Sequence, residues 1–380
     1  MKKLSINKKD IPGLISAVLF FAVLVGLAAA TIASPKSERS DIENRSLERF
    51  PKFTLSRVMD KRYMDGLESY LSDHFVGRIG WIQAKNSLVR STGKPETNGV
   101  FICGDRLIQR FSEVDYEVTD ASIDALNEFA EATEKPVYLM VVPTAADIYS
   151  DSLPKNVRNV NQKKYIEYIC KYVSDEVNTL DVYGALQTMR DEYIYYRNDH
   201  HWTTRGAYYA YYSCGKRMNF TPYGIEGFDI EYASYDFRGS LYSKALYGDT
   251  PADILEIYHN TEMPDASEVI LNNRDSFSSM YFMEFAEEKD KYSTFLGRNQ
   301  PFVTIKSGNE EGGKLLIFKD SYAHCFVPFL LPHFSEISLV DMRYIEGSYT
   351  EYCDAEDYDS ILFLYNAENF ATDSNISRMK

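Results

Sequence analysis

The segment Asn198–Trp202 (NDHHW) brings together residue types that can move a proton. It holds two of the six histidines in the chain, and Asp199 precedes His201 by two residues. In a loop that leads into a helix, an aspartate at this spacing can bond one imidazole nitrogen and leave the other as a general base. Two other interpretations stay open. Asp199 simply caps the next helix, a role also suited to Thr203 or Thr204, or the segment binds a metal, although no third ligand stands at a useful spacing.

Ser321 lies between a predicted strand and a predicted helix, a position that favours a nucleophilic serine. The run Lys314–Phe318 predicts a buried strand, Ser321 follows it, and Tyr322–Leu331 has the pattern of a helix. A sharp turn between the two exposes the hydroxyl and directs backbone N–H groups toward a developing oxyanion. Asn366, after the predicted strand Asp359–Tyr365, can add a side-chain amide donor. The competing interpretations are a helix cap at Ser321 and a turn residue at Asn366.

A serine becomes nucleophilic beside a base, and the base needs a group that orients it. The chain offers one of each in Ser321, His201 and Asp199, so we predict that these three form a catalytic triad. Their separation along the sequence leaves open whether they meet in space.

Short apolar strands alternate with helical segments along much of the chain. The predicted strands are Pro136–Val142, Leu180–Tyr183, Lys314–Phe318, Glu336–Val340 and Asp359–Tyr365, and the predicted helices are Thr119–Glu134, Gln162–Val177, Thr203–Met218 and Tyr322–Leu331. This alternation predicts an α/β fold with a parallel sheet covered by helices on both faces, and such sheets bind ligands at the carboxyl ends of their strands. Residues 219–312 break the pattern and are interpreted as an insertion of strands and loops. A helix is also expected over residues 54–75, and a hairpin over Val100–Ile108.

The N-terminus predicts a membrane anchor. The uncharged run Ile11–Ala33 is long enough to cross a bilayer, and four lysines precede it. The positive-inside rule makes residues 1–10 a cytoplasmic tail, which places a stalk over 34–53 and a catalytic domain over 54–375 outside the cytoplasm. A cleaved signal peptide ending in Ala28–Ser34 is the alternative, and it would release a secreted protein.

The net charge and the cysteine content limit the kinds of partner and cofactor that we expect. The formal net charge of −15 disfavours nucleic acid, because acidic surfaces repel phosphates. Five scattered cysteines without a CxxC pair suggest neither a zinc cluster nor a disulfide framework. We therefore expect no metal and no cofactor.

The stretch Tyr196–Tyr212 (YRNDHHWTTRGAYYAYY) resembles the signature of the DHHW protein family, which is similar to the SGNH-hydrolase-like proteins that O-acetylate alginate and other exopolysaccharides. Further matches are Glu43-Asn44-Arg45, Phe50-Pro51, Asp73–Arg78, Val142–Pro154, Lys319–Leu330 and Val340–Tyr344. The resemblance spans roughly residues 40–370. It implies a three-layer, flavodoxin-like SGNH sheet with circularly permuted motif order, since the Asp-His pair precedes the serine.

By that resemblance, Asp199, His201 and Ser321 take the triad roles. Asn366 is the candidate oxyanion asparagine, although the usual Gly-x-Asn is absent, and Arg343 or Gly347 is a candidate for the remaining donor. The aromatic residues that adjoin these positions are candidates for substrate binding: Trp202, Tyr322 and Tyr365.

The expected reaction is transfer of an acetyl group through acyl-Ser321 to a polysaccharide hydroxyl. The resemblance implies a multi-spanning membrane O-acyltransferase as the acyl donor, while residues 11–33 contact the bilayer. With water as acceptor the same triad is a carbohydrate esterase. A non-catalytic, cell-surface polysaccharide-binding module and a metal-dependent hydrolase are the other classes that remain.

Overall fold

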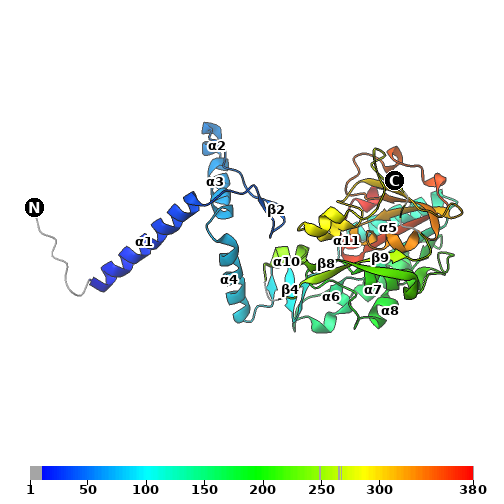
Figure 1. The fold of residues 1–380 in the computed structure, drawn as a ribbon, viewed down its shortest axis with the longest axis horizontal. Coiled ribbons are helices and arrows are strands. Elements are labelled where there is room, and N and C mark those ends of the chain that lie inside the picture. The colour runs from blue at the N-terminus through cyan, green and yellow to red at the C-terminus, as the bar shows by residue number, and fades with distance from the viewer. Residues whose placement is uncertain (1–10, 248–249, 264–265, 267, 380) are drawn as a thin grey trace, which may run out of the picture. The chain divides into compact units, whose positions relative to one another are not determined.

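The computed structural model describes residues 11–247, 250–263, 266 and 268–379. The chain divides into two compact units, one ending at Thr92 and the other beginning at Gly93 (Figure 1).

The first unit contains the apolar helix α1 (Ile11–Ala33), which is long and apolar enough to cross a membrane. A signal sequence meets the same test, and the lysine-bearing tail lies outside the described residues. The helix expected over residues 54–75 is interrupted at Lys61, whose φ of 68° lies in the left-handed region. The remaining elements are β1 (Arg39–Ser40), β2 (Arg45–Ser46), α2 (Leu55–Met59), α3 (Arg62–Asp73) and α4 (Arg78–Ser91).

Two of the quoted sequence matches meet inside the first unit. Arg45 Nη1 donates to Asp73 Oδ2 at 2.9 Å, and Arg78 pairs with Glu43. The hydrogen bond from Arg45 is the main reason that the pKa of Asp73 falls to about 2. The Glu43-Asn44-Arg45 and Asp73–Arg78 stretches thus tie the segment after α1 to the α3–α4 turn.

The second unit is built on an eight-stranded sheet in the order β11-β10-β12-β14-β13-β15-β6-β7. The five strands from β14 to β7 run parallel, and β12, β10 and β11 extend one edge antiparallel. Phe318 pairs with both Val340 and Phe363, so the carboxyl ends of three central strands are level. The strands are β6 (Val137–Val142), β7 (Val177–Thr179), β10 (Glu268–Leu271), β11 (Asp275–Phe277), β12 (Phe302–Lys306), β13 (Gly313–Lys319), β14 (Phe334–Val340) and β15 (Ser360–Asn366).

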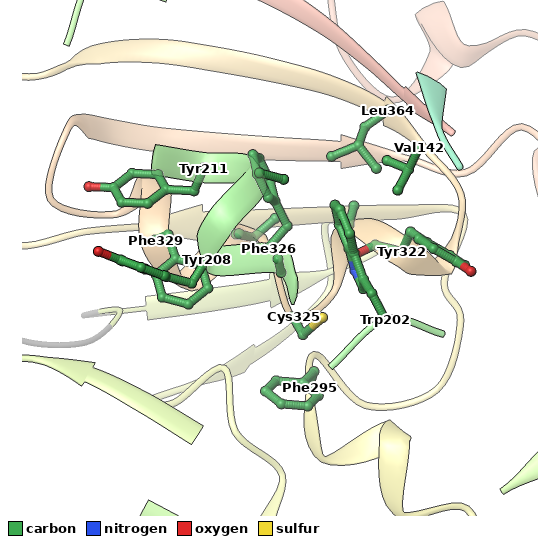
Figure 2. Packing of buried hydrophobic residues seen from close by; sticks show 14 of the residues in the cluster. Val142, Trp202, Tyr208, Tyr211, Phe295, Tyr322, Cys325, Phe326, Phe329 and Leu364 are labelled. Atoms are coloured by element: carbon green, nitrogen blue, oxygen red, sulfur yellow. The ribbon is translucent and has the colours of Figure 1, made fainter. Parts of the chain in front are cut away.

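Alternate residues of the central strands feed two separate hydrophobic cores. Met140 and Leu364 belong to one core, whereas Leu139 and Phe363 belong to the other. The first core is covered by α6 (Ala145–Ile148), α8 (Tyr183–Thr188) and α9 (Thr204–Cys214), and the second by α5 (Tyr116–Ala132), α7 (Gln162–Tyr172) and α11 (Ala367–Thr372). Each fully buried Leu or Phe contributes about 1.5–3 kcal/mol. The expected three-layer α/β fold is confirmed, and Figure 2 shows part of the first core, with Trp202 and Tyr322 beside Val142 and Leu364.

Residues 219–312 do not form a separate body. Their strands β10, β11 and β12 belong to the main sheet, while β8 (Phe228–Phe237) and β9 (Asp253–Asn260) pair with each other and α10 (Ser240–Ala245) lies between them in sequence. The expected hairpin is present as β4 (Val100–Cys103) and β5 (Arg106–Gln109), joined with β3 (Glu96–Thr97).

Two local predictions are wrong. The strand expected at Leu180–Tyr183 lies earlier, as β7, and α8 begins at Tyr183. In place of a helix over Tyr322–Leu331 there are two short 3-10 segments, η6 (Ser321–Ala323) and η7 (Val327–Leu330). Pro328 lies in the first turn of η7 and has no N–H for an i→i−4 bond, so an α-helix cannot continue through it.

Candidate functional site

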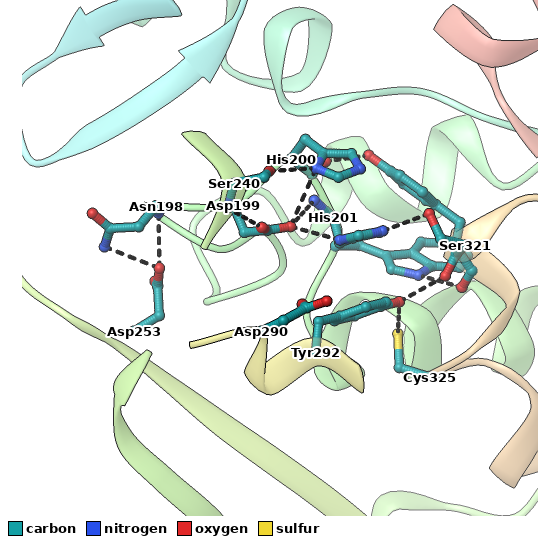
Figure 3. Close-up of polar contacts among 12 residues, drawn as sticks. Asn198, Asp199, His200, His201, Ser240, Asp253, Asp290, Tyr292, Ser321 and Cys325 are labelled. Carbon is teal, nitrogen blue, oxygen red and sulfur yellow. Dashed lines mark hydrogen bonds and ion pairs between the residues drawn. The ribbon is translucent and has the colours of Figure 1, made fainter. Parts of the chain in front are cut away.

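Asp199, His201 and Ser321 are joined by hydrogen bonds although 120 residues separate the last two (Figure 3). His201 Nδ1 lies 2.5 Å from Asp199 Oδ1, and His201 Nε2 lies 2.7 Å from Ser321 Oγ. An ionised carboxylate only accepts, so Nδ1 carries the proton and Nε2 accepts from the serine hydroxyl. All three side chains are buried. This is the arrangement in which an imidazole can remove the proton of a serine.

Two further hydrogen bonds join the His200–Trp202 segment to Tyr322, and each side donates one of them. Trp202 Nε1 donates to the carbonyl of Tyr322 at 3.0 Å, and the Tyr322 hydroxyl donates to the carbonyl of His200 at 2.5 Å. Thr203 caps α9 by accepting from the N–H of Gly206 at 3.2 Å, as the sequence allowed. The histidine segment is therefore fixed against the serine turn on one side and by a helix on the other.

Asp253, in β9, holds the backbone in front of Asp199. Its carboxylate accepts from the N–H groups of Arg197 and Asn198, both at 2.7 Å, and from the hydroxyl of Tyr193 at 2.5 Å. It is fully buried, and burial raises its pKa. The segment 219–312 thus supplies a group that orients the loop, and no pattern in the sequence signals it.

The second oxygen of Asp199 is held by the same segment. Asp199 Oδ2 accepts from the N–H of Ser240 at 2.7 Å, and a Cβ at Gly239 would overlap the Asp199 carboxylate. Burial alone would raise the pKa of Asp199, but the adjacent imidazoles of His200 and His201 and the Ser240 N–H hold it well below its usual value. Asp199 is accordingly the anionic member of the site.

Asp320 fixes the turn that presents Ser321. Its Oδ2 accepts from the backbone N–H of Asn366 at 2.8 Å and from the side-chain amides of Asn366 and Asn369, while Oδ1 accepts from the N–H of Tyr322 at 2.8 Å. These bonds leave the N–H of Ser321 without a partner among the described residues. In general, a fixed N–H next to a reacting serine can stabilise an oxyanion.

The three sequence candidates for an oxyanion donor differ in placement. Asn366 uses its amide to bind Asp320 at 2.7 Å and its oxygen to cap α11, so it orients the turn. Gly347 occupies a left-handed turn, with φ of 93°, and does not border the cleft that lies beside His200 and Tyr322. Arg343 does border it, and its Nε and Nη2 donate to Asp341 at 2.8 and 2.7 Å.

A buried polar network supports Arg343 from beneath. Lys319 Nζ donates to Asp341 Oδ2 at 3.0 Å and lies 2.8 Å from His324 Nε2. Because the ammonium group only donates, His324 must be neutral, and burial lowers its pKa well below the usual value. Lys319 and Arg343 together hold the pKa of Asp341 low against the effect of burial.

A cleft of about 150 Å³ lies beside the triad, at the carboxyl ends of β6, β13, β14 and β15. It is lined by Gln109, Thr144, Ala145, Ala146, His200, Ser240, Leu241, Lys244, Tyr322, Arg343, Asn366, Glu368 and Asn369. Of the candidate substrate-binding aromatics, only Tyr322 borders this cleft. All three side chains are at most 1% exposed: Trp202 and Tyr322 belong to the first core and Tyr365 to the second, so none of them offers appreciable surface to a ligand.

The other histidine of the pair faces the cleft. His200 Nδ1 lies 2.7 Å from Ser240 Oγ, and its ring packs 3.9 Å from that of His201. Burial, followed by the charge of His201, lowers the pKa of His200 to about 3. His200 is therefore a neutral, half-buried residue at the cleft wall.

Asp199, His200 and His201 also place potential metal ligands within 4.8 Å of one another. Both nitrogens of His201 are already engaged, one by Asp199 and one by Ser321. A metal at His201 would have to break one of these bonds, so the arrangement fits a triad better than a metal centre.

Known proteins give a family and a fold. The model for the family described as DHHW protein matches residues 89–340, more than half of the chain. No curated protein matches the sequence. A crystal structure of a DHHW family protein from Eubacterium siraeum DSM 15702 is similar, with 27% identity, a TM-score of 0.65, and coverage of 74% of this chain and 95% of that one.

Two more distant structures share coverage of similar extent. Bacillus cereus PatB1 with a sulfonyl adduct has 18% identity and a TM-score of 0.63, over 73% of this chain and 97% of that one. The O-acetyltransferase domain of Pseudomonas putida AlgJ has 13% identity and a TM-score of 0.46, over 72% and 93%. The predicted family is confirmed: this chain belongs to the DHHW family.

Proposed function

We propose that this protein is a serine O-acyltransferase that works outside the cytoplasm and acetylates the hydroxyl groups of a polysaccharide through an acyl-Ser321 intermediate. The observation that carries the proposal is the 2.7 Å contact between His201 Nε2 and Ser321 Oγ, backed by the 2.5 Å bond from His201 to Asp199. A serine bonded to an oriented imidazole is the arrangement for nucleophilic acyl transfer.

In the first step, Ser321 Oγ attacks the carbonyl carbon of an acetyl ester while His201 Nε2 takes the hydroxyl proton. The bond from carbonyl carbon to the leaving oxygen breaks, and that oxygen receives the proton from Nε2. Asp199 stabilises the imidazolium that exists between these two transfers. The enzyme is left acetylated on Ser321 with a neutral His201.

In the second step, a sugar hydroxyl gives its proton to His201 Nε2 and attacks the acetyl-serine. The new ester bond forms, the Oγ–carbon bond breaks, and Ser321 Oγ takes the proton back. The N–H of Ser321, which has no partner among the described residues, and the guanidinium of Arg343, which borders the cleft, are the donors we assign to the oxyanion in both steps.

The acceptor is assigned to the cleft because its wall contains both hydrogen-bond donors and acceptors. Lys244 and Arg343 donate, Glu368 accepts, and Asn369 and His200 can do both. Such a mixed wall suits a molecule with several hydroxyl groups better than it suits an apolar ester. The acyl group would come from a multi-spanning membrane O-acyltransferase, and α1 would hold the protein at the same membrane, although a cleaved signal sequence would leave it secreted.

Ser321→Ala and His201→Ala should each lower acetyl turnover at least about a hundredfold, because the nucleophile or its base is lost. The full chain in detergent is incubated with p-nitrophenyl acetate, and p-nitrophenol release and intact mass are followed in the same sample. A Ser321-dependent acetyl adduct that disappears when a glucan or alginate oligosaccharide is added, with acetate on the sugar, supports the transferase.

Release of free acetate despite added sugar would make the protein an esterase. No adduct from folded protein would favour a binding module, and loss of activity with a chelator but not with Ser321→Ala would favour a metal-dependent hydrolase.

His200→Gln should leave the pH dependence of the rate between mildly acidic and neutral solution unchanged and lower the rate only mildly. Burial lowers the pKa of His200 to about 3, so this residue stays neutral throughout that range. The rates of wild type and His200→Gln are compared as a function of pH. A flattened or displaced profile in His200→Gln would transfer the role of base to His200.

Gly239→Ala should lower turnover at least about tenfold without unfolding the protein, because the added Cβ overlaps the Asp199 carboxylate and must displace it. Gly184→Ala in α8 is the matched control, since its Cβ meets nothing within 4 Å. Steady-state rates and thermal unfolding of both variants are compared. Equal rates for the two would show that the position of Asp199 does not limit the reaction.

A further inference from the structure

One buried side chain contacts both the base and the nucleophile of the proposed triad. Tyr292 lies in the short 3-10 segment Lys291–Thr294, within the part of the chain whose role the sequence did not reveal. Its ring stacks on the His201 imidazole with 3.8 Å between centroids and 8° between planes. Its hydroxyl donates to the backbone carbonyl of Ser321 at 2.9 Å and lies 3.4 Å from Cys325 Sγ.

The hydrogen bonds of His201 leave one motion of its ring unopposed. Asp199 and Ser321 hold the two nitrogens, but neither bond resists a tilt of the ring plane about the line that joins them. A parallel aromatic face resists that tilt. Figure 3 shows Tyr292 on one side of the His201 ring and His200 on the other, where the centroids are 3.9 Å apart.

The stack also has an electrostatic consequence. When His201 takes the serine proton, it becomes a cation that lies against the electron-rich face of a phenol, in a site from which water is largely excluded. A cation over an aromatic face is stabilised, more so when both are desolvated. The phenol itself stays neutral, because burial raises its pKa well above the usual value.

The segment that carries Tyr292 is anchored well enough to act as a support. Phe282 N–H donates to the Thr294 carbonyl at 2.9 Å, and Leu296 N–H donates to the Met280 carbonyl at 2.8 Å, which closes the 280–296 loop on itself. Lys289 Nζ donates to the carbonyl of Arg238, the residue before Gly239. The loop is therefore tied to the turn between β8 and α10, beside the Ser240 N–H that donates to Asp199.

We propose that Tyr292 is a positioning residue that sets the plane of the His201 ring by stacking and the place of Ser321 through its carbonyl, so that residues 219–312 complete the triad from the side opposite the cleft-facing His200. The inference rests on the proposed function for its kinetic consequence. The geometry of the imidazole can also be measured without turnover.

The kinetic experiment compares Tyr292→Leu and Tyr292→Phe in the full chain in detergent. The first removes both contacts, and the second removes only the hydroxyl bond. We expect the rate of Ser321 acetylation in the p-nitrophenol burst to fall about thirtyfold or more in Tyr292→Leu and about fivefold in Tyr292→Phe. The KM for p-nitrophenyl acetate should change less than about twofold in both, because neither contact is with the substrate.

Tyr258→Leu is the matched control. Tyr258 is 1% exposed, lies in the same part of the chain, and is in the same core, but none of its ring contacts or hydrogen bonds is with a triad residue. It should lose stability and keep the acetylation rate. If Tyr292→Leu does not fold, Tyr292→Met fills the same space with a flexible apolar chain and takes its place. A rate for the Leu variant within about twofold of wild type, or an equal loss in Tyr258→Leu, would overturn the proposal.

The second readout is the far-downfield proton resonance of the short His201–Asp199 hydrogen bond. It should persist in Tyr292→Phe and broaden beyond detection in Tyr292→Leu, because a tilting ring exchanges its proton with water. An unchanged resonance in Tyr292→Leu would reject the positioning role whatever the turnover. A wild-type resonance that depends on Tyr292, in a protein that forms no Ser321 adduct, would keep this inference and reject the acyltransferase.

Discussion

The hydrogen bond between His201 and Ser321 is the contact on which the rest of the site depends, because it joins two loops that are 120 residues apart. A single bond of this kind contributes only about 1 kcal/mol net, which is too little to hold two loops together. Two more hydrogen bonds join the same loops, from Trp202 to the Tyr322 carbonyl and from Tyr322 to the His200 carbonyl, and they add to the stability of the contact. The tryptophan of the NDHHW segment, Trp202, therefore has a structural role, and its indole ring is completely buried.

The parallel sheet gives this contact a rigid base. Ser321 follows β13, and Asp320 binds the end of β15 through Asn366, so two neighbouring strands set the position of Ser321. The histidine loop has no strand of its own and relies on Asp253 and Ser240 from the segment 219–312. The buried carboxylates of Asp199 and Asp253 both accept hydrogen bonds. These bonds offset the cost of removing a charged group from water. The segment that interrupts the α/β pattern is thus part of the machinery that orients the site.

The sequence predicts the central strands and the chemistry-bearing residues well, for a local reason. Runs such as Leu315–Phe318 and Ile361–Leu364 are apolar because they are buried on both faces, and that pattern can be read without tertiary contacts. The helix after Ser321 was mispredicted because the aromatic and apolar residues there fill a core, and Pro328 prevents an α-helix. An aromatic ring beside a site looks the same in sequence whether it faces a ligand or a core, so the sequence does not reveal that Trp202, Tyr322 and Tyr365 are buried.

The supporting residues could not be predicted because their roles exist only through distant contacts. Gly239, Ser240 and Tyr292 belong to no motif. Their roles follow from contacts with Asp199, His201 and Ser321, which are distant in the sequence. Arg343 was a candidate only by analogy, and its place beside the cleft follows from Asp341 and Lys319, which are buried beneath it.

The activation of Ser321 by His201 is tested most directly with a sulfonyl fluoride, which reacts with activated serines and needs neither acceptor nor membrane partner. The full chain in detergent is treated with phenylmethylsulfonyl fluoride, and the modified peptide is mapped by mass spectrometry for wild type, His201→Ala and Asp199→Asn. Our account predicts a single adduct on Ser321 in wild type and its loss or strong slowing in both variants. An adduct at another residue, or equal labelling of Ser321 without His201, would contradict it.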